Sequence, residues 1–321
     1  MAQPTNTYAT NDTEGIREDL SDVIALVARE ECPLQEIMPT RNVSATKHEW
    51  QTRDLATASS SNAHIEGDDT SLEAANVPVR VGNYTQISKK SVVVSGTTQA
   101  VDHAGIQDVL DDQIEIKLIE LKRDMESQML SNTASDPGTD VAARVSAGLP
   151  AWLETNVSRG ATGADGGYNS GTGVVDAATD GTQRAFPEPI LKDVIQDAWT
   201  NGGNPNTIML GPYNKRVFSG FSGIADLRRD ANETSQAGIV AAADMFISDF
   251  GTQQVVVNRF QRERDMFVID PNFLAQGSLR APFYEELSKT GDNTKGQIIV
   301  EYTLIVDNEK AHGQGADLTT S

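Results

Sequence analysis

The chain has 321 residues, enough for one large or two ordinary domains with a substantial buried core. It carries 46 acidic and 26 basic side chains, and the formal net charge of −20 opposes a broad electrostatic grip on nucleic acid or on an anionic membrane. A single cysteine excludes an intramolecular disulfide framework, and four histidines leave few soft metal ligands.

The spacing of apolar residues near the N-terminus predicts a short amphipathic helix that follows a polar tail. Apolar residues recur at steps of three and four within positions 14–29, and Cys32 and Pro33 end the pattern. They are Ile16, Leu20, Val23, Ile24 and Val27. This helix would pack on its own chain or on a neighbour. Cys32 is expected to act as a small apolar filler, and residues 1–15 lack the pattern of a secretory signal.

Residues 39–78 form a polar segment with little apolar content. Such a segment cannot offset the entropic cost of its own ordering, at about 1–2 kcal/mol per residue. Two interpretations stay open: an extended two-stranded arm laid across another subunit, and a mobile surface loop. Within it, His64, Glu66, Asp68 and Asp69 could suit a hard cation, but they lack calcium-loop spacing. A solvated acidic loop is the preferred interpretation.

Two strong elements follow. Residues 84–98 are rich in β-branched side chains and predict a strand or a strand pair. Residues 102–132 predict one long helix, a rod of about 40 Å, because apolar side chains recur along one stripe. The stripe consists of Ile106, Leu110, Ile114, Leu118, Leu121, Met125 and Met129.

Residues 135–182 are rich in glycine, alanine, aspartate and threonine, and predict irregular chain over a lightly packed surface. The glycines at 160–173 lack the spacing of a phosphate-binding loop, so we expect no nucleotide site there.

The remainder predicts a mixed α/β domain of alternating short helices and strands, closed by a strong final strand. Helices are expected at 189–199 and 213–218, and strands at 207–210, 244–250, 253–258, 266–269 and 297–306, with a turn at Gly251–Thr252. The strand at 297–306 is expected to pair with the strands at 84–98.

No arrangement of side chains indicates catalysis. The chain lacks the serine-hydrolase and zinc-protease motifs, and Glu285 and Glu286 are adjacent, so their side chains diverge on regular structure. We therefore predict no enzyme activity and assign no catalytic, cofactor-binding or metal-binding residue. Subunit contact is instead predicted for Trp50, Arg53, Lys89, Lys90 and Trp152. The competing interpretations are local packing for the tryptophans and internal salt bridges for the lysines.

Several segments in series resemble the family of tailed-phage major head proteins typified by that of coliphage SU-ten. The resemblance extends from about Thr40 to Gly315 and is carried by residues 244–260, 267–271, Leu279–Arg280, 287–292 and 300–304, with 308–311 after them. It implies an α+β fold of the Hong Kong 97 capsid type.

That fold implies a division of the chain. Residues 1–39 would be an N-terminal arm, 40–83 an extended β loop, and 84–185 a peripheral domain whose spine helix is 102–132. Residues 186–282 would be a mixed α/β axial domain, and 283–321 a return to the peripheral domain with the C-terminal tail.

The implied function is that of a structural major capsid protein that self-assembles into an icosahedral or prolate head enclosing viral double-stranded DNA. Its partners would be copies of itself in pentamers and hexamers, a portal, separate scaffolding or decoration proteins, and DNA through non-specific proximity. We expect no cofactor and no membrane contact, with assembly in the host cytoplasm and residence in the virion. The alternatives are a minor head or decoration protein of the same virus, or a non-viral acidic surface-layer protein.

Overall fold

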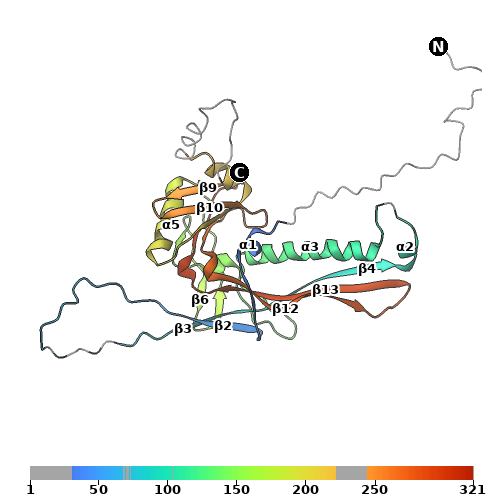
Figure 1. Cartoon of the computed structure of the whole chain (residues 1–321), viewed down its shortest axis with the longest axis horizontal. Helices are drawn as coiled ribbons and strands as arrows, with labels where there is room; N and C mark the ends of the chain where they lie inside the picture. Colours follow the sequence, from blue (N-terminus) through green and yellow to red (C-terminus); the bar gives the residue numbers. More distant parts are fainter. Residues whose placement is uncertain are drawn as a thin grey trace, which may run out of the picture.

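The computed structural model describes residues 31–221 and 244–320, apart from residues 68, 70, 71, 73 and 104. The helix predicted for residues 14–29 therefore lies outside the described residues. The described chain is an elongated subunit that mixes helices and strands (Figure 1).

The long axis of the subunit follows a four-stranded sheet with the strand order β1-β12-β13-β4. Its strands are β1 (Thr40–Asn42), β12 (Leu274–Leu287), β13 (Asn293–Val306) and β4 (Gln86–Ser95). β13 pairs antiparallel with β4 over ten positions, with Ile298 opposite Lys90. The predicted pairing of 297–306 with 84–98 is therefore confirmed.

β12 was not predicted, although it is as long as β13. The outer half of the strand is largely exposed, so it lacks the alternating apolar pattern that marks a half-buried strand. Its pairing with β13 also shifts register between Ser278 and Phe283, and such irregularities bend a strand. β12 runs through position 282, where the predicted axial domain was expected to end.

The spine helix α3 (Val109–Met129) covers one face of this sheet beside β4 (Figure 1). The prediction of 102–132 was too long at both ends. Gly105 has φ +76°, which breaks a right-handed helix, and Asp108 caps the helix by accepting hydrogen bonds from the backbone amides of Leu110 and Asp111. Ile106 therefore lies before the helix, and the fully buried part of the stripe is confined to Leu121, Met125 and Met129.

A second sheet forms the other end of the subunit, with the order β5-β14-β11-β8-β10-β9. Its strands are β5 (Val157–Ser158), β14 (Gly313–Gly315), β11 (Met266–Ile269), β8 (Thr207–Leu210), β10 (Gly251–Val257) and β9 (Met245–Ser248). Helices α5 (Glu188–Thr200) and α6 (Pro212–Phe218) share an apolar core with it. The predicted mixed α/β character is confirmed. The turn between β9 and β10 is Asp249–Phe250 rather than Gly251–Thr252, since Gly251 pairs with Ser248.

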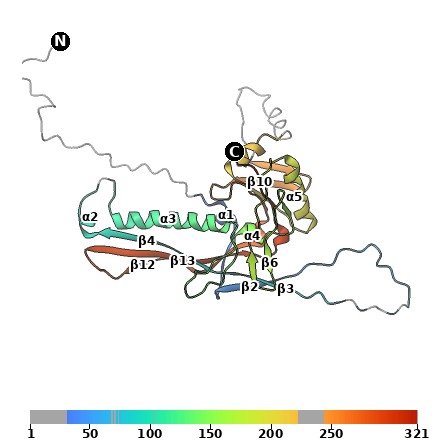
Figure 2. The same ribbon diagram turned by 180° about the vertical axis from the view of Figure 1, so that it is seen from behind.

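Two small ribbons and several short helices complete the fold. The ribbons are β2 (Lys47–Thr52) with β3 (Val79–Tyr84), and β6 (Gly167–Asn169) with β7 (Val174–Asp176). The short helices are α1 (Pro33–Ile37), α2 (Gly96–Ala100), α4 (Leu149–Trp152), and the single turns η2 (Pro271–Phe273) and η3 (Glu309–Ala311). Residues 53–78 join β2 to β3 without regular structure wherever they are described. They extend away from the subunit in the direction opposite to the β12–β13 tip (Figures 1 and 2).

Neighbouring valines of β4 offer a matched test of this packing. Val92 is 4% exposed and Val93 is 62% exposed, because successive strand residues face opposite sides of the sheet. Val92→Ala should lower the free energy of unfolding by about 2 kcal/mol through lost burial and a residual cavity. Val93→Ala should change it by less than about 0.5 kcal/mol. Urea unfolding of the unassembled chain measures both, and equal effects would contradict the assigned faces.

Candidate functional site

The two tryptophans predicted for subunit contact pack against each other inside the subunit. Trp152 is 3% exposed, and its ring lies 5.4 Å from that of Trp50 and 6.1 Å from that of Tyr168. Trp50 donates a hydrogen bond from Nε1 to the backbone carbonyl of Val306 at 3.0 Å. These aromatic contacts therefore tie the β2–β3 ribbon to the hydrophobic core between α3 and the four-stranded sheet. This is the local packing that was the competing interpretation for both tryptophans.

The two lysines of the predicted contact set point to opposite faces of the sheet. Lys90 faces α3 and forms ion pairs with Asp124 at 2.6 Å and with Glu120 at 3.8 Å. Lys89 is exposed on the other face and has no ion partner among the described residues. Arg53, at the start of the connecting loop, is exposed too. The structure leaves Arg53 and Lys89 accessible and engages Lys90 internally.

The connection between β2 and β3 exposes large apolar side chains that the described part of the subunit does not cover. Leu55 is 92% exposed and Leu72 is 96% exposed, and Ile65 and Val77 are almost as open. Residues 53–78, termed the extended loop, thus place several large aliphatic groups in water. Exposed aliphatic groups gathered in one segment are typical of a contact surface.

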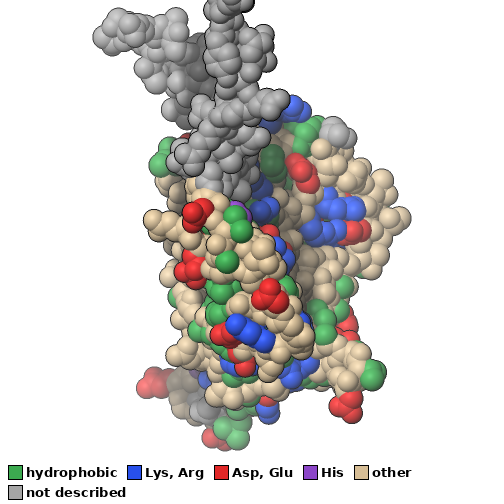
Figure 3. Space-filling view, turned by 90° about the vertical axis from the view of Figure 1, so that its right-hand side faces the viewer, with side chains coloured by type: hydrophobic (Ala, Val, Ile, Leu, Met, Phe, Trp, Pro, Cys, Tyr) green, Lys and Arg blue, Asp and Glu red, His purple; other side chains and the backbone are tan. Residues whose placement is uncertain are grey.

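The four-stranded sheet has a second face that α3 does not cover. Its exposed side chains, termed the uncovered sheet face, are Ile87, Lys89, Ser91, Val93, Phe283, Glu285 and Leu287. Lys89, Ile299 and Phe283 stand directly opposite one another on β4, β13 and β12, so they share this face. In the end-on view of the subunit, hydrophobic, basic and acidic groups lie interspersed (Figure 3). The face combines exposed apolar area with the carboxylate of Glu285 and with Lys89, which has no ion partner in the described part of the chain.

One buried carboxylate joins three separate parts of the chain. Glu126 is fully buried, and it accepts hydrogen bonds from the backbone amides of Leu34 at 2.7 Å and Gln35 at 3.2 Å. It also accepts from Gln35 Nε2 at 3.1 Å and from Asn258 Nδ2 at 2.7 Å. Burial raises the pKa of Glu126, and these donors oppose that rise. Glu126 therefore links α1, the spine helix and the segment after β10.

A second buried carboxylate, Glu301 of β13, lies on the side of the four-stranded sheet that α3 does not cover. It forms ion pairs with Arg144 at 2.6 Å and with Arg280 at 2.9 Å, and it accepts a hydrogen bond from Thr85 Oγ1 at 2.9 Å. The strand pattern at 297–306 revealed the alternation but carried no sign that Glu301 is inside. The cross-chain arginines could not be inferred without the fold.

The glycine-rich segment does bind an anion through backbone amides, but the anion belongs to the same chain. Asp317 is buried and accepts hydrogen bonds from the amides of Gly160 at 3.1 Å and Gly181 at 2.9 Å. It also pairs with Arg264 at 2.6 Å. This part of the chain thus fastens the C-terminal residues.

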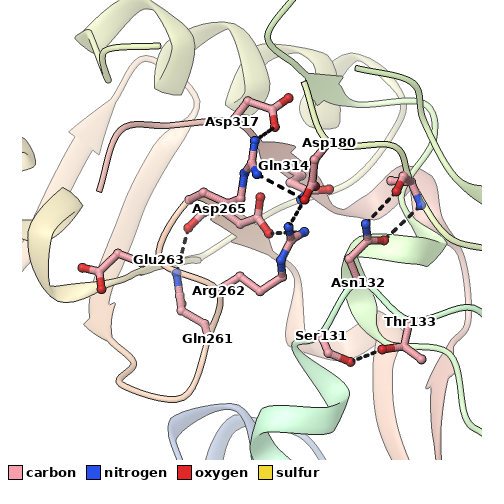
Figure 4. Close-up of polar contacts among 12 residues, drawn as sticks. Ser131, Asn132, Thr133, Asp180, Gln261, Arg262, Glu263, Asp265, Gln314 and Asp317 are labelled. Atoms are coloured by element: carbon pink, nitrogen blue, oxygen red, sulfur yellow. Dashed lines mark hydrogen bonds and ion pairs between the residues drawn. The ribbon is translucent and has the colours of Figure 1, made fainter. Parts of the chain in front are cut away.

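Arginines and aspartates extend that contact into a network (Figure 4). Arg262 reaches Asp180 at 2.5 Å and Asp265 at 3.2 Å, while Arg264 also reaches Asp180 at 3.2 Å. Burial raises the pKa of Asp265 to about 6, and Arg262 opposes that rise. The network binds residues 180–181 to the segment that leads into β11 of the six-stranded sheet. Nearby, Asn132 binds Ala178 through two hydrogen bonds.

These buried groups have structural partners rather than the geometry of a reaction site. The described residues contain no group of three or more histidine, cysteine or carboxylate side chains placed to hold a metal. His64 pairs with Asn62 at 3.0 Å, and Asp68 lies outside the described residues. Burial raises the pKa of Cys32 to about 11, which keeps its thiol protonated. In the part of the chain that is described, no helix has the length and apolar composition to cross a membrane.

Comparisons with known proteins agree with one another. A family model described as SU10 major capsid protein matches residues 3–319. The major capsid protein of Escherichia phage Phieco32 is 25% identical over 349 residues, which cover 98% of this chain and 97% of that protein.

Solved structures are similar over nearly the whole chain. One from Gordonia phage Cozz has a TM-score of 0.62 at 13% identity and covers 99% of this chain and 98% of its own. One from Mycobacterium phage Bobi has a TM-score of 0.62 at 10% identity and covers 96% and 98%. The capsid of a native GTA particle has a TM-score of 0.61 at 13% identity and covers 97% and 98%. The α+β fold is therefore the Hong Kong 97 type that the resemblance implied.

Asp265→Asn tests the buried network through its pH dependence. The raised pKa means that the folded protein holds this proton more tightly than the unfolded chain does. The wild type should therefore lose stability as the pH rises from about 4 to about 6. A shift from 3.8 to about 6 corresponds to about 3 kcal/mol. Relative to the wild type, the variant's unfolding free energy should rise by about 2 kcal/mol between these pH values, because the full effect develops from below pH 3.8 to above about pH 6.

Denaturant unfolding of the full chain in a series of buffers measures this difference. Asp140→Asn, an exposed carboxylate in the same chain, serves as the control and should follow the wild type at every pH. A difference between Asp265→Asn and wild type that stays constant with pH would contradict the assigned burial.

Proposed function

Because the chain belongs to the SU10 major capsid protein family and is a structural, shell-forming capsid protein of a phage, we propose that the extended loop of one copy packs on the uncovered sheet face of the next. The observation that carries this proposal is the exposure of Leu55 and Leu72, at 92% and 96%. The same family membership sets aside a minor head protein and a surface-layer protein.

The energetics favour a contact between unlike surfaces. The extended loop has no core of its own, so it gains order only when another surface buries its aliphatic groups. The uncovered sheet face offers Ile87, Val93 and Phe283, which are open to water in the lone subunit. A contact between two different surfaces repeats around a ring and closes if the rotation permits. A shell of many copies needs such a contact.

The uncovered sheet face and the extended loop also carry opposite charges. Lys89 stands between Ile87 and Val93 on the uncovered sheet face and has no ion partner among the described residues. The extended loop carries the exposed carboxylates Glu66 and Asp69. Opposite charges at a contact fix its register more than they add affinity. We infer that Lys89 faces these carboxylates of the neighbouring copy, and that Arg53 contributes at the start of the loop.

The remaining features of the role follow from the same premise. The copies would form pentamers and hexamers of an icosahedral or prolate head around double-stranded DNA, with a portal and separate scaffolding or decoration proteins, assembled in the host cytoplasm. An acidic wall would limit adhesion of the packaged DNA, which stays near it through non-specific proximity. The protein would act without catalysis.

The domain division stays part of this proposal. Residues 1–39 would serve as arm, 40–83 as extended β loop, 84–185 as peripheral domain, 186–282 as axial domain, and 283–321 as the return to the peripheral domain. β12 belongs to the peripheral sheet from Leu274 onward, so the chain would leave the axial domain before the expected position 282.

Shortening the extended loop tests whether assembly needs this loop while folding of the subunit does not. Replacing residues 55–77 by a short glycine–serine turn removes the exposed aliphatic groups and keeps β2 and β3. The variant should unfold like the wild type but form no shells, as negative-stain microscopy reports. Val141→Asp, a change at another exposed aliphatic residue (99% exposed), is the control and should assemble. Normal shells from the shortened chain would refute the proposed contact.

Ionic strength should control assembly because every copy carries a formal charge of −20. Copies repel one another at low salt, and at physiological ionic strength the repulsion is screened over about 8 Å. Light scattering from the purified chain should therefore rise as salt increases from about 10 mM to about 500 mM. Scattering that stays flat across this range would count against a charge-limited assembly.

A further inference from the structure

An apolar groove runs along the side of the spine helix next to the point where the described chain begins. It has a volume of about 350 Å³ and lies between α1, α3 and β12. Its lining residues are Gln35, Leu118, Ile119, Leu121, Lys122, Met125, Gln276 and Pro282. Leu118 is 40% exposed although it sits on the same helix as the buried Leu121 and Met125. A mainly aliphatic groove that is open to water is a candidate binding site for an apolar segment.

We propose that residues 14–29 of the same chain occupy this groove before assembly. This inference goes beyond the proposed shell contact, which uses the other face of the sheet and the extended loop. Three observations support it: the position of the chain start, the apolar pattern of the segment, and the charge at the rim of the groove.

The position of the chain start makes the segment a close neighbour of the groove. The described chain begins at Glu31, and Gln35 already lines the groove. Val27 and Gln35 are eight positions apart, and that length spans up to about 28 Å when extended. The groove residues Leu118 to Met125 occupy about 10 Å of helix. A tether this short gives an effective concentration of about millimolar, so the chain's own segment outcompetes a free copy in dilute solution.

The apolar pattern of the segment matches an apolar groove. As a helix, residues 14–29 would be about 24 Å long and would carry one aliphatic stripe. The stripe is Ile16, Leu20, Val23, Ile24 and Val27. An amphipathic helix that lays such a stripe into a groove is a recurrent mode of recognition, in which side chains three and four apart act as anchors.

The charge at the rim favours this segment. Lys122 is exposed at the groove and has no ion partner among the described residues. Residues 14–29 contain four acidic and two basic side chains, so the segment brings a net negative charge toward that lysine. Glu126, one residue from Met125, anchors α1 at Leu34 and Gln35. These hydrogen bonds hold α1, where the described chain begins, against α3, whose side chains line the groove.

Paired cysteines test the placement in the full-length chain. Leu20→Cys combined with Leu118→Cys should form a disulfide within one chain when the protein is oxidised at low salt and micromolar concentration. The control combines Leu20→Cys with Val93→Cys, which is exposed on the uncovered sheet face. Cys32 does not interfere, because burial raises its pKa to about 11 and keeps the thiol unreactive.

Non-reducing electrophoresis and mass spectrometry of linked peptides measure the yield of intrachain disulfide. We expect at least about tenfold more intrachain disulfide in the groove pair than in the control pair. Equal yields would overturn the proposal. Disulfides that join two chains would overturn it as well, and would make a second copy the occupant.

A single-cysteine measurement does not depend on disulfide geometry. The thiol introduced by Leu118→Cys should react with a maleimide about tenfold more slowly in the full chain than after Leu20→Asp is added, because the charged residue removes an anchor from the stripe. Ser21→Asp, beside the stripe, is the matched control and should leave the rate slow. Equal rates in all three proteins would overturn the proposal. Both measurements are made on the unassembled chain, so their result is obtained independently of shell formation.

Discussion

The arrangement of this subunit depends on a carboxylate that has no access to water. Glu126 lies at the buried end of the spine helix, and a carboxylate there must find donors, because an unpaired buried charge costs several kcal/mol. The donors come from Leu34 and Gln35 at the start of the described chain and from Asn258 after β10. One residue thereby ties α1, the spine helix and the segment after β10 to one another.

Around that junction the fold builds a rigid frame and leaves selected surfaces open. α3 covers one face of the four-stranded sheet, while the other face keeps Val93 and Phe283 in water. The extended loop keeps Leu55 and Leu72 in water. A monomeric protein would bury such groups within itself, whereas a protein that acts in many identical copies leaves them for its neighbours.

Much of the element order was predictable from local pattern. β-branched residues at 84–98 predicted a strand or a strand pair, and alternation at 297–306 predicted a strong strand. The two segments pair at one edge of the four-stranded sheet. The tryptophans show the limit of such patterns. Polar neighbours of Trp50 and Trp152 suggested exposed contacts, yet the two rings pack against each other at a tilt, although about one hundred residues of chain separate them. Side chains that meet at that separation leave no periodic trace in either segment.

The sequence by itself determined the net charge, the core-poor composition of residues 39–78 and the amphipathic stripe of the long helix, because these are local properties of the chain. Tertiary structure alone decided that Glu126 and Glu301 lie inside and that β12 joins the four-stranded sheet. It also decided that Lys90 is paired while Lys89 has no ion partner among the residues that the structure describes. The physical reason is that burial and ion pairing depend on which distant segments meet. Glu126 meets Leu34 across 92 positions, and Glu301 meets Arg144 across 157.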